Sequence, residues 1–161
     1  METEVSILKH QMSFINSTTR HTGLIAGYGA GKSFGGIAKT INKKIELKGI
    51  DVAYYLPTYP LIKDIEFPKF AEMLSLFGIK YTLNRTDKEF ITPYGRIIMR
   101  TMDNPDLIVG YEVGYSLIDE PDVLAKDKMK DIFIKVLVRY RSPLPNDQIN
   151  QLNFVSNPEG F

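Results

Sequence analysis

The sequence contains no cysteine, no long apolar run and almost no net charge, and each absence removes a class of function. Without cysteine among its 161 residues, the chain has no disulfide and no thiolate metal site, and it suits a reducing compartment. No apolar run approaches the roughly 18–20 residues that a membrane-spanning helix requires, so we expect no membrane partner. The formal net charge of +1 gives no overall basic excess, so any contact with nucleic acid must come from a local patch or from neighbouring subunits.

Targeting and metal signals are also scarce. The chain begins Met-Glu-Thr-Glu, which is not the start of a signal peptide. The two histidines, His10 and His21, do not have the spacing of metal ligands, and there is no internal repeat. A chain of this length is enough for one compact domain, so we expect a single domain over residues 1–161, inside the cell.

The strongest motif is a glycine-rich turn between an apolar run and a helical segment. Residues 26–33 read Ala-Gly-Tyr-Gly-Ala-Gly-Lys-Ser and follow Gly-Leu-Ile. Strand, glycine-rich turn and helix are the context of a phosphate-binding P-loop, because glycines let backbone N–H groups surround an anion at a helix N-terminus. Lys32 is then expected to reach the β- and γ-phosphates of ATP, and the Ser33 hydroxyl to hold Mg²⁺. The predicted nucleotide-binding residues are Gly27, Tyr28, Gly29, Ala30, Gly31, Lys32 and Ser33.

A second chemical signal is an apolar run that ends in two acids, Tyr-Ser-Leu-Ile-Asp-Glu at residues 115–120. Alone it is weak, since strands often end in acidic turns. After a P-loop it has the form of a Walker B strand, which brings Asp119 next to the Mg²⁺ on Ser33. Glu120 is then the candidate catalytic base that orients and deprotonates the attacking water.

Apolar periodicity along the chain predicts alternating helices and strands, and hence an α/β fold with a mostly parallel sheet between helices. Pro68 is expected to kink or split the third helix, and Pro93-Tyr94-Gly95 to turn a hairpin. The expected helices cover residues 5–16, 34–45, 61–77 and 129–137, and the expected strands cover residues 51–56, 79–83, 89–92, 96–100, 115–119 and 151–155.

Two polar features of the sequence, Gln11 and the Ser156-Asn157 pair, each allow a functional and a purely structural interpretation. The side-chain amide of Gln11, ahead of the first strand, can bind the edge of adenine because it both donates and accepts, or it can simply face solvent. Ser156 and Asn157 follow the last strand, where they can hydrogen-bond the γ-phosphate or the lytic water, or form a simple turn before Pro158.

Taken together, the motifs resemble the ATPase domain of the large terminase subunit of tailed bacteriophages, the motor that packages DNA into the procapsid. The resemblance covers essentially the whole chain. Its more specific parts accompany the Walker motifs, and they are Gln11, Leu56-Pro57-Thr58-Tyr59, Gly110-Tyr111-Glu112, Arg139-Tyr140-Arg141 and the closing Ser156-Asn157-Pro158-Glu159-Gly160-Phe161.

The resemblance implies an ASCE-type (RecA-like) P-loop NTPase fold and a Mg²⁺-dependent ATPase. It implies that Gln11 contacts adenine, Asp119 is the Walker B acid and Glu120 the catalytic carboxylate. Ser156 and Asn157 would form the coupling motif that links the state of the γ-phosphate to movement. The implied partners are double-stranded DNA, the portal protein and the small terminase subunit, with a ring of subunits when assembled, a monomer in isolation, and the host cytoplasm as location.

The sequence departs from the family in three places. Tyr28 and Val109 stand where many members carry an arginine that can serve as the arginine finger, so Arg139 or Arg141 becomes the candidate finger, or the finger comes from elsewhere in the complex. We expect the nuclease domain usual in the family to be absent from this chain, which would then be an excised domain or would work with a nuclease on a separate chain. Two other functions stay open: one RecA-like half of a DNA helicase, with residues 119–122 as its Asp-Glu-x-Asp box, and a non-hydrolysing nucleotide-binding assembly switch.

Overall fold

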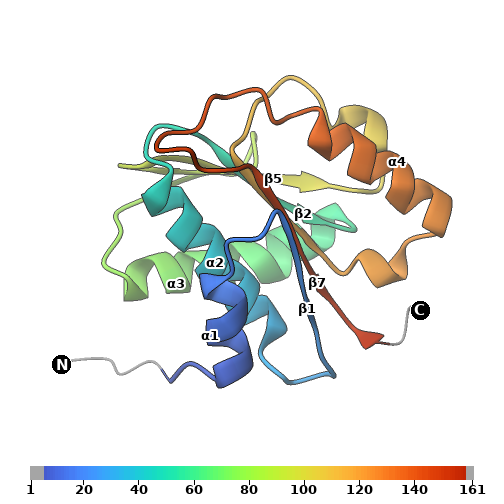
Figure 1. Ribbon diagram of the computed structural model, residues 1–161, viewed down its shortest axis with the longest axis horizontal. Coiled ribbons are helices and arrows are strands. Elements are labelled where there is room, and N and C mark those ends of the chain that lie inside the picture. The colour runs from blue at the N-terminus through green and yellow to red at the C-terminus, as the bar shows by residue number, and fades with distance from the viewer. Residues whose placement is uncertain (1–5, 159–161) are drawn as a thin grey trace.

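Seven strands form one sheet in the computed structural model, which describes residues 6–158 (Figure 1). The strand order is β1-β7-β6-β2-β5-β4-β3, parallel from β1 to β5 and antiparallel from β5 to β3. The predicted α/β class with a mostly parallel sheet is confirmed. The strands are β1 (His21–Ile25), β2 (Val52–Leu56), β3 (Thr82–Asn84), β4 (Glu89–Thr92), β5 (Gly95–Thr101), β6 (Tyr115–Asp119) and β7 (Gln151–Ser156).

Helices cover both faces of the sheet, with α1, α2 and α3 on one side and α4 on the other (Figure 1). Each face has its own buried apolar cluster, because successive residues of β2, β6 and β7 point to opposite faces. The helices are α1 (Lys9–Asn16), α2 (Lys32–Glu46), α3 (Phe67–Leu76) and α4 (Lys126–Leu137), with a π-helix η1 (Leu61–Glu66) and 3₁₀ turns η2 (Pro105–Leu107) and η3 (Pro121–Val123).

Several predicted elements have other bounds. The helix predicted over 5–16 begins at Lys9, and the helix predicted over 129–137 begins at Lys126. The helix over 61–77 is split, as Pro68 predicts, into the π-helix η1 and α3, and Pro68 lies in the first turn of α3. The predicted strand over 79–83 begins only at Thr82, because the Ile79 N–H donates to Leu74 O at 2.8 Å and closes the end of α3. Among residues 6–158, no helix combines the length and apolar character needed to cross a bilayer.

Lys39 joins α1 to α2 through a buried ammonium group. Its Nζ donates to Phe14 O at 2.6 Å and to Ser17 O at 2.8 Å, two carbonyls at the C-terminal end of α1. The side chain is fully buried, and this burial lowers the pKa of Lys39 to about 8. Because Gln11 of α1 contacts the P-loop, as described below, Lys39 helps to position α1 beside the candidate nucleotide site.

The lowered pKa of Lys39 predicts a pH dependence of stability. Between about pH 8 and pH 10.5 the unfolded chain carries the Lys39 proton more often than the folded chain does, so the free energy of unfolding rises with pH in this window. We expect a rise of up to about 3 kcal/mol from this group. Urea unfolding at pH 8 and at pH 10 should show that Lys39→Met removes this share of the rise, whereas Lys48→Met, at an exposed position, does not. Equal slopes in the parent and in Lys39→Met would contradict the assignment.

Candidate nucleotide-binding site

The P-loop lies at the carboxyl end of β1 and leads directly into α2. Gly29 and Gly31 adopt φ of 75° and 71°, in the left-handed region that glycine enters without strain. Gly31 is the N-cap of α2, so the first N–H groups of the helix are free to face an anion. Lys32 Nζ donates to Gly27 O at 2.6 Å, which folds the lysine back across the loop. The backbone therefore has the form that a phosphate requires.

The Gln11 side chain of α1 is hydrogen-bonded to the P-loop backbone. Its Nε2 donates to Gly31 O at 2.9 Å, and its Oε1 accepts from the Leu8 N–H at 2.8 Å, with the side chain buried. A Cβ on Gly31 would clash with Gln11 Nε2, so this contact depends on glycine. Both ends of the amide are thus engaged within the protein. In this conformation neither is free for adenine, and a role in adenine binding would require the amide to release these bonds.

The Walker B acid lies at the end of β6, facing α2. Asp119 is 3% exposed, and its Oδ2 accepts a hydrogen bond of 2.7 Å from Tyr54 Oη on β2. Burial raises the pKa of Asp119 to about 6, although the Tyr54 hydrogen bond acts in the opposite direction. A buried carboxylate with this raised pKa favours a cation nearby, because positive charge offsets the desolvation of its ionised form.

Glu120 follows in a backbone conformation that non-glycine residues rarely adopt. Its φ and ψ are 55° and 47°, and its N–H donates to Val155 O at 2.9 Å. The turn directs the chain out of β6 into η3, and the Glu120 side chain is partly exposed at the mouth of the site. Such strain persists where the surrounding structure fixes the residue, and it is frequent at functional sites.

Ser156 and Asn157, at the end of β7, are connected to the Walker B loop through Asp122. Ser156 Oγ donates to Asp122 Oδ1 at 2.9 Å, and Asn157 Nδ2 donates to Asp122 Oδ2 at 3.4 Å. Asn157 Oδ1 is buried and has no hydrogen-bond partner among the described residues. These contacts exceed those of a simple turn, and they tie the end of β7 to the turn after β6. Glu159, Gly160 and Phe161 of the closing motif lie outside the described residues.

These segments line one hollow of about 310 Å³ between the carboxyl ends of the parallel strands and the N-terminus of α2. Ligands of open α/β sheets bind at this edge. The structure thus brings the P-loop, the Walker B acids and the Ser-Asn pair together, as the sequence predicts. The lining residues are Tyr28, Gly29, Gly31, Lys32, Ser33, Phe34, Asp119, Glu120, Val155, Ser156 and Asn157.

The donor set fits Mg²⁺ bound together with a nucleotide. The Ser33 hydroxyl and the Asp119 carboxylate both line the hollow, and hydroxyl and carboxylate oxygens are hard ligands that suit Mg²⁺. Within residues 6–158, no group of three or more histidine, aspartate or glutamate side chains could hold a metal by itself.

Two residues near the site carry no signal in the sequence. Glu66, on η1, is 2% exposed, and burial together with the Asp119 charge raises its pKa to about 7. Lys69 lies beside it, with Nζ 3.6 Å from Glu66 Oε2. Only the π-helical turn and the packing of α3 against α2 bring this pair towards Asp119, so local pattern could not have found it.

The two candidate arginine fingers lie at the other end of the sheet. Arg139 O accepts from the Val113 N–H at 3.1 Å, and Tyr140 Oη donates to Gln151 O at 2.9 Å, so the segment packs where β6 and β7 begin. The P-loop lies where β1 ends. Neither Arg139 nor Arg141 is placed to reach the nucleotide of its own chain, because the full length of the parallel strands separates the two edges.

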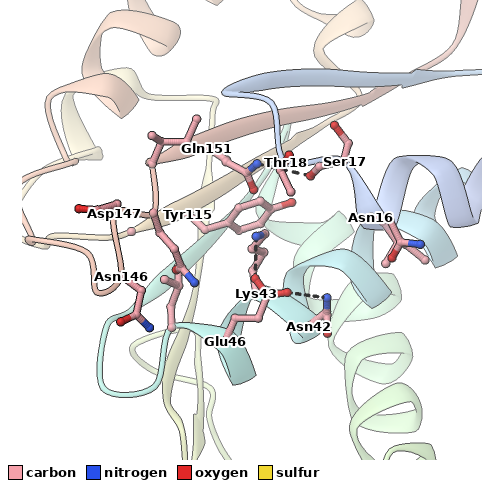
Figure 2. Close-up of a pocket in the computed structure, with 15 residues that line it drawn as sticks. Asn16, Ser17, Thr18, Asn42, Lys43, Glu46, Tyr115, Asn146, Asp147 and Gln151 are labelled. Atoms are coloured by element: carbon pink, nitrogen blue, oxygen red, sulfur yellow. Dashed lines mark hydrogen bonds and ion pairs between the residues drawn. The ribbon is translucent and has the colours of Figure 1, made fainter.

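A second hollow, of about 460 Å³, opens at this same amino-terminal edge (Figure 2). Figure 2 shows Tyr115 and Gln151 at its centre, with Lys43 and Glu46 below them in the view. Lys43 Nζ and Glu46 Oε2 form an ion pair at 2.7 Å. Tyr115 Oη and Gln151 Oε1 have no hydrogen-bond partner among the described residues, but both atoms are covered from solvent. None of the residues predicted for nucleotide binding lines this hollow.

No family model and no curated protein matches the sequence, whereas solved structures do. The large terminase of a thermophilic bacteriophage superposes with a TM-score of 0.74 at 14% identity, over 93% of this chain and 39% of the terminase. The ATPase domain of the large terminase from Thermus phage P74-26 gives 0.70 at 17% identity, over 94% of this chain and 64% of that chain. The N-terminal domain of the DNA packaging ATPase from bacteriophage phi29 gives 0.60 at 13% identity, over 86% and 76%.

The chain therefore has the fold of the ATPase domains of large terminases, and the resemblance inferred from its motifs is confirmed at the level of the fold. It spans about two fifths of the thermophilic phage terminase and about two thirds of the P74-26 ATPase domain. The thermophilic phage terminase has also been solved with ADP and with ATP-γ-S.

Proposed function

We propose that this chain is an ATP-hydrolysing motor domain of a DNA-packaging terminase. The observation that carries the proposal is the single hollow in which a P-loop, two Walker B acids and the Ser156-Asn157 pair meet, on the fold of terminase ATPase domains. The likeness of fold supports the class of machine, and the chemistry of the hollow supports a nucleoside triphosphate as ligand.

The residues of the hollow divide the work of hydrolysis. The P-loop N–H groups and Lys32 hold the phosphates, and Lys32 exchanges its bond to Gly27 O for phosphate oxygens. Ser33 and Asp119 would hold Mg²⁺, which neutralises charge that develops on the phosphates. Glu120, partly exposed at the mouth of the hollow, orients the attacking water and accepts its proton.

Asp122 would couple ATP hydrolysis to movement of the domain, because it contacts both strand ends of the site. It ties the end of β7 to the turn after β6, so Glu120 and Asn157 move as one unit if either strand end shifts. Loss of the γ-phosphate would change what Asn157 contacts, and Asp122 would pass that change to η3 and α4. This is the coupling role of Ser156 and Asn157 in our proposal.

The partners follow from the class of machine. We propose that the motor acts on double-stranded DNA in the host cytoplasm, as a ring of subunits docked on the portal protein and supplied with DNA by the small terminase subunit. The chain alone would be a monomer and a slow ATPase. Because Arg139 and Arg141 lie away from their own nucleotide, an arginine finger would come from a neighbouring subunit, and both arginines stay candidates for that role in trans.

The proposal is tested by packaging with the native gene product, portal-bearing procapsids, the small subunit, duplex DNA and ATP. We expect DNA to become nuclease-resistant in proportion to the ATP consumed, and turnover to be higher with DNA and procapsids than without them. Ser156→Ala and Asp122→Asn should keep ATP binding but lower the length of DNA packaged per ATP. Duplex unwinding without packaging would favour a helicase, and tight ATP binding without turnover in the complete mixture would favour an assembly switch.

A further inference from the structure

Tyr54 lies behind the Walker B carboxylate, on the strand next to it. β2 pairs with β6 so that Tyr54 is opposite Leu117, and Asp119 is therefore two residues further along on the same face. Diagonal neighbours of this kind are within reach of a long aromatic side chain. Tyr54 Oη donates to Asp119 Oδ2 at 2.7 Å, and both side chains are at most 3% exposed.

The surrounding packing holds the Tyr54 hydroxyl in place. Its ring meets Phe70 of α3 edge to face, with ring centroids 5.1 Å apart. From the other side, α2 passes over the hydroxyl at Gly36, where an added Cβ would lie 3.3 Å from Tyr54 Oη. A glycine at this point of α2 makes room for the hydroxyl beneath the helix.

The hydrogen bond gives the two oxygens of Asp119 different roles: Oδ2 accepts from Tyr54, and Oδ1 can bind a cation. Because Tyr54 donates to Oδ2, this oxygen is engaged and the plane of the carboxylate is fixed, while Oδ1 is left for a cation. Without the donor, the carboxylate could rotate, and it would lie beside the buried Glu66 carboxylate with less to stabilise its charge. Partners of this kind orient metal ligands and tune their affinity.

We propose that Tyr54 is a positioning residue that orients Asp119 towards the Mg²⁺ of a bound nucleotide. The inference rests on the proposed function of the hollow as a Mg²⁺-nucleotide site, and it adds a residue that the Walker motifs do not contain. The chain offers a matched control in the next residue. Tyr55 is also fully buried on β2, but it points to the opposite face, where its hydroxyl meets Tyr111 Oη at 3.0 Å.

The test measures how much Mg²⁺ tightens the binding of ATP-γ-S, as the Kd in EDTA divided by the Kd in saturating Mg²⁺, by calorimetry. We expect Tyr54→Phe to reduce this factor by about 10–100-fold, or to one, while the Kd in EDTA stays within twofold of the parent. Tyr55→Phe should leave both values unchanged. In an Asp119→Asn background, Tyr54→Phe should have no further effect, because the residue through which it acts is gone.

Each alternative outcome is distinguishable. If the parent binds Mg²⁺ and ATP-γ-S and Tyr54→Phe shows the same tightening, the positioning role is wrong while the proposed function stands. If the parent shows no tightening by Mg²⁺, the proposed function itself fails. Should Tyr54→Phe not fold, Tyr54→Met, which also removes the donor from Asp119 Oδ2, must lower the tightening factor, and an unchanged factor there would overturn the inference.

Discussion

Replacing Glu120 by glutamine is expected to lower ATP turnover by about 10²–10⁴-fold, the usual contribution of a general base. Glutamine keeps the shape of the side chain and does not alter the backbone bond from the Glu120 N–H to Val155 O, so the turn after β6 should persist. The amide can no longer accept the proton of the attacking water. Binding of ATP should be retained, since the phosphates are held by the P-loop and Lys32.

Steady-state hydrolysis in the complete packaging mixture and calorimetric ATP binding together check this expectation. Glu46→Gln is the matched control, because it makes the same chemical change at the far end of α2, where Glu46 pairs with Lys43 on the surface. The control should hydrolyse ATP as the parent does. Turnover that survives in Glu120→Gln would show that another group is the base.

Replacing Lys32 by alanine is expected to weaken ATP binding by about 10–150-fold, because charge-assisted hydrogen bonds contribute about 1.5–3 kcal/mol each. Hydrolysis should fall further than binding does, since charge on the phosphates grows in the transition state. In the structure Lys32 Nζ contacts Gly27 O at the surface of the loop, so the fold should remain intact.

Lys43→Ala provides the control for Lys32→Ala. It removes a lysine from the same helix, three turns away, whose partner is Glu46 and not a phosphate. Calorimetry should show a Kd close to that of the parent for this variant, and circular dichroism should confirm that both variants are folded. An unchanged Kd in Lys32→Ala would mean that the glycine-rich turn is not a P-loop.

The motifs that the sequence reveals are those whose geometry is local. A strand, a glycine-rich turn and a helix N-terminus are consecutive in the chain, so the conformation of Gly29 and Gly31 and the place of Lys32 follow from order alone. The end of an apolar strand likewise places Asp119 and Glu120. For the same reason the split at Pro68 could be predicted, because proline acts on its own turn.

The expectations for Gln11, Arg139 and Arg141 depend on distant neighbours, and here the structure adds what the sequence lacks. Gln11 was expected either to face adenine or to face solvent, but the entry angle of α1 turns it under Gly31. The arginines follow α4, which runs back along the sheet and leaves them at its opposite edge. A local sequence pattern does not specify the angle of α1 or the direction of α4 relative to the sheet.

The α/β class, the glycine-rich turn and the acidic end of β6 could be predicted from the chain, because each is specified by adjacent residues. The groups that contact them depend on how distant segments pack. Tyr54 meets Asp119 because the register of β2 against β6 makes them diagonal neighbours, and Asp122 meets Ser156 because η3 follows the strand that pairs with β7. Register and helix packing are set by long-range burial, and therefore the chain must fold before these contacts exist.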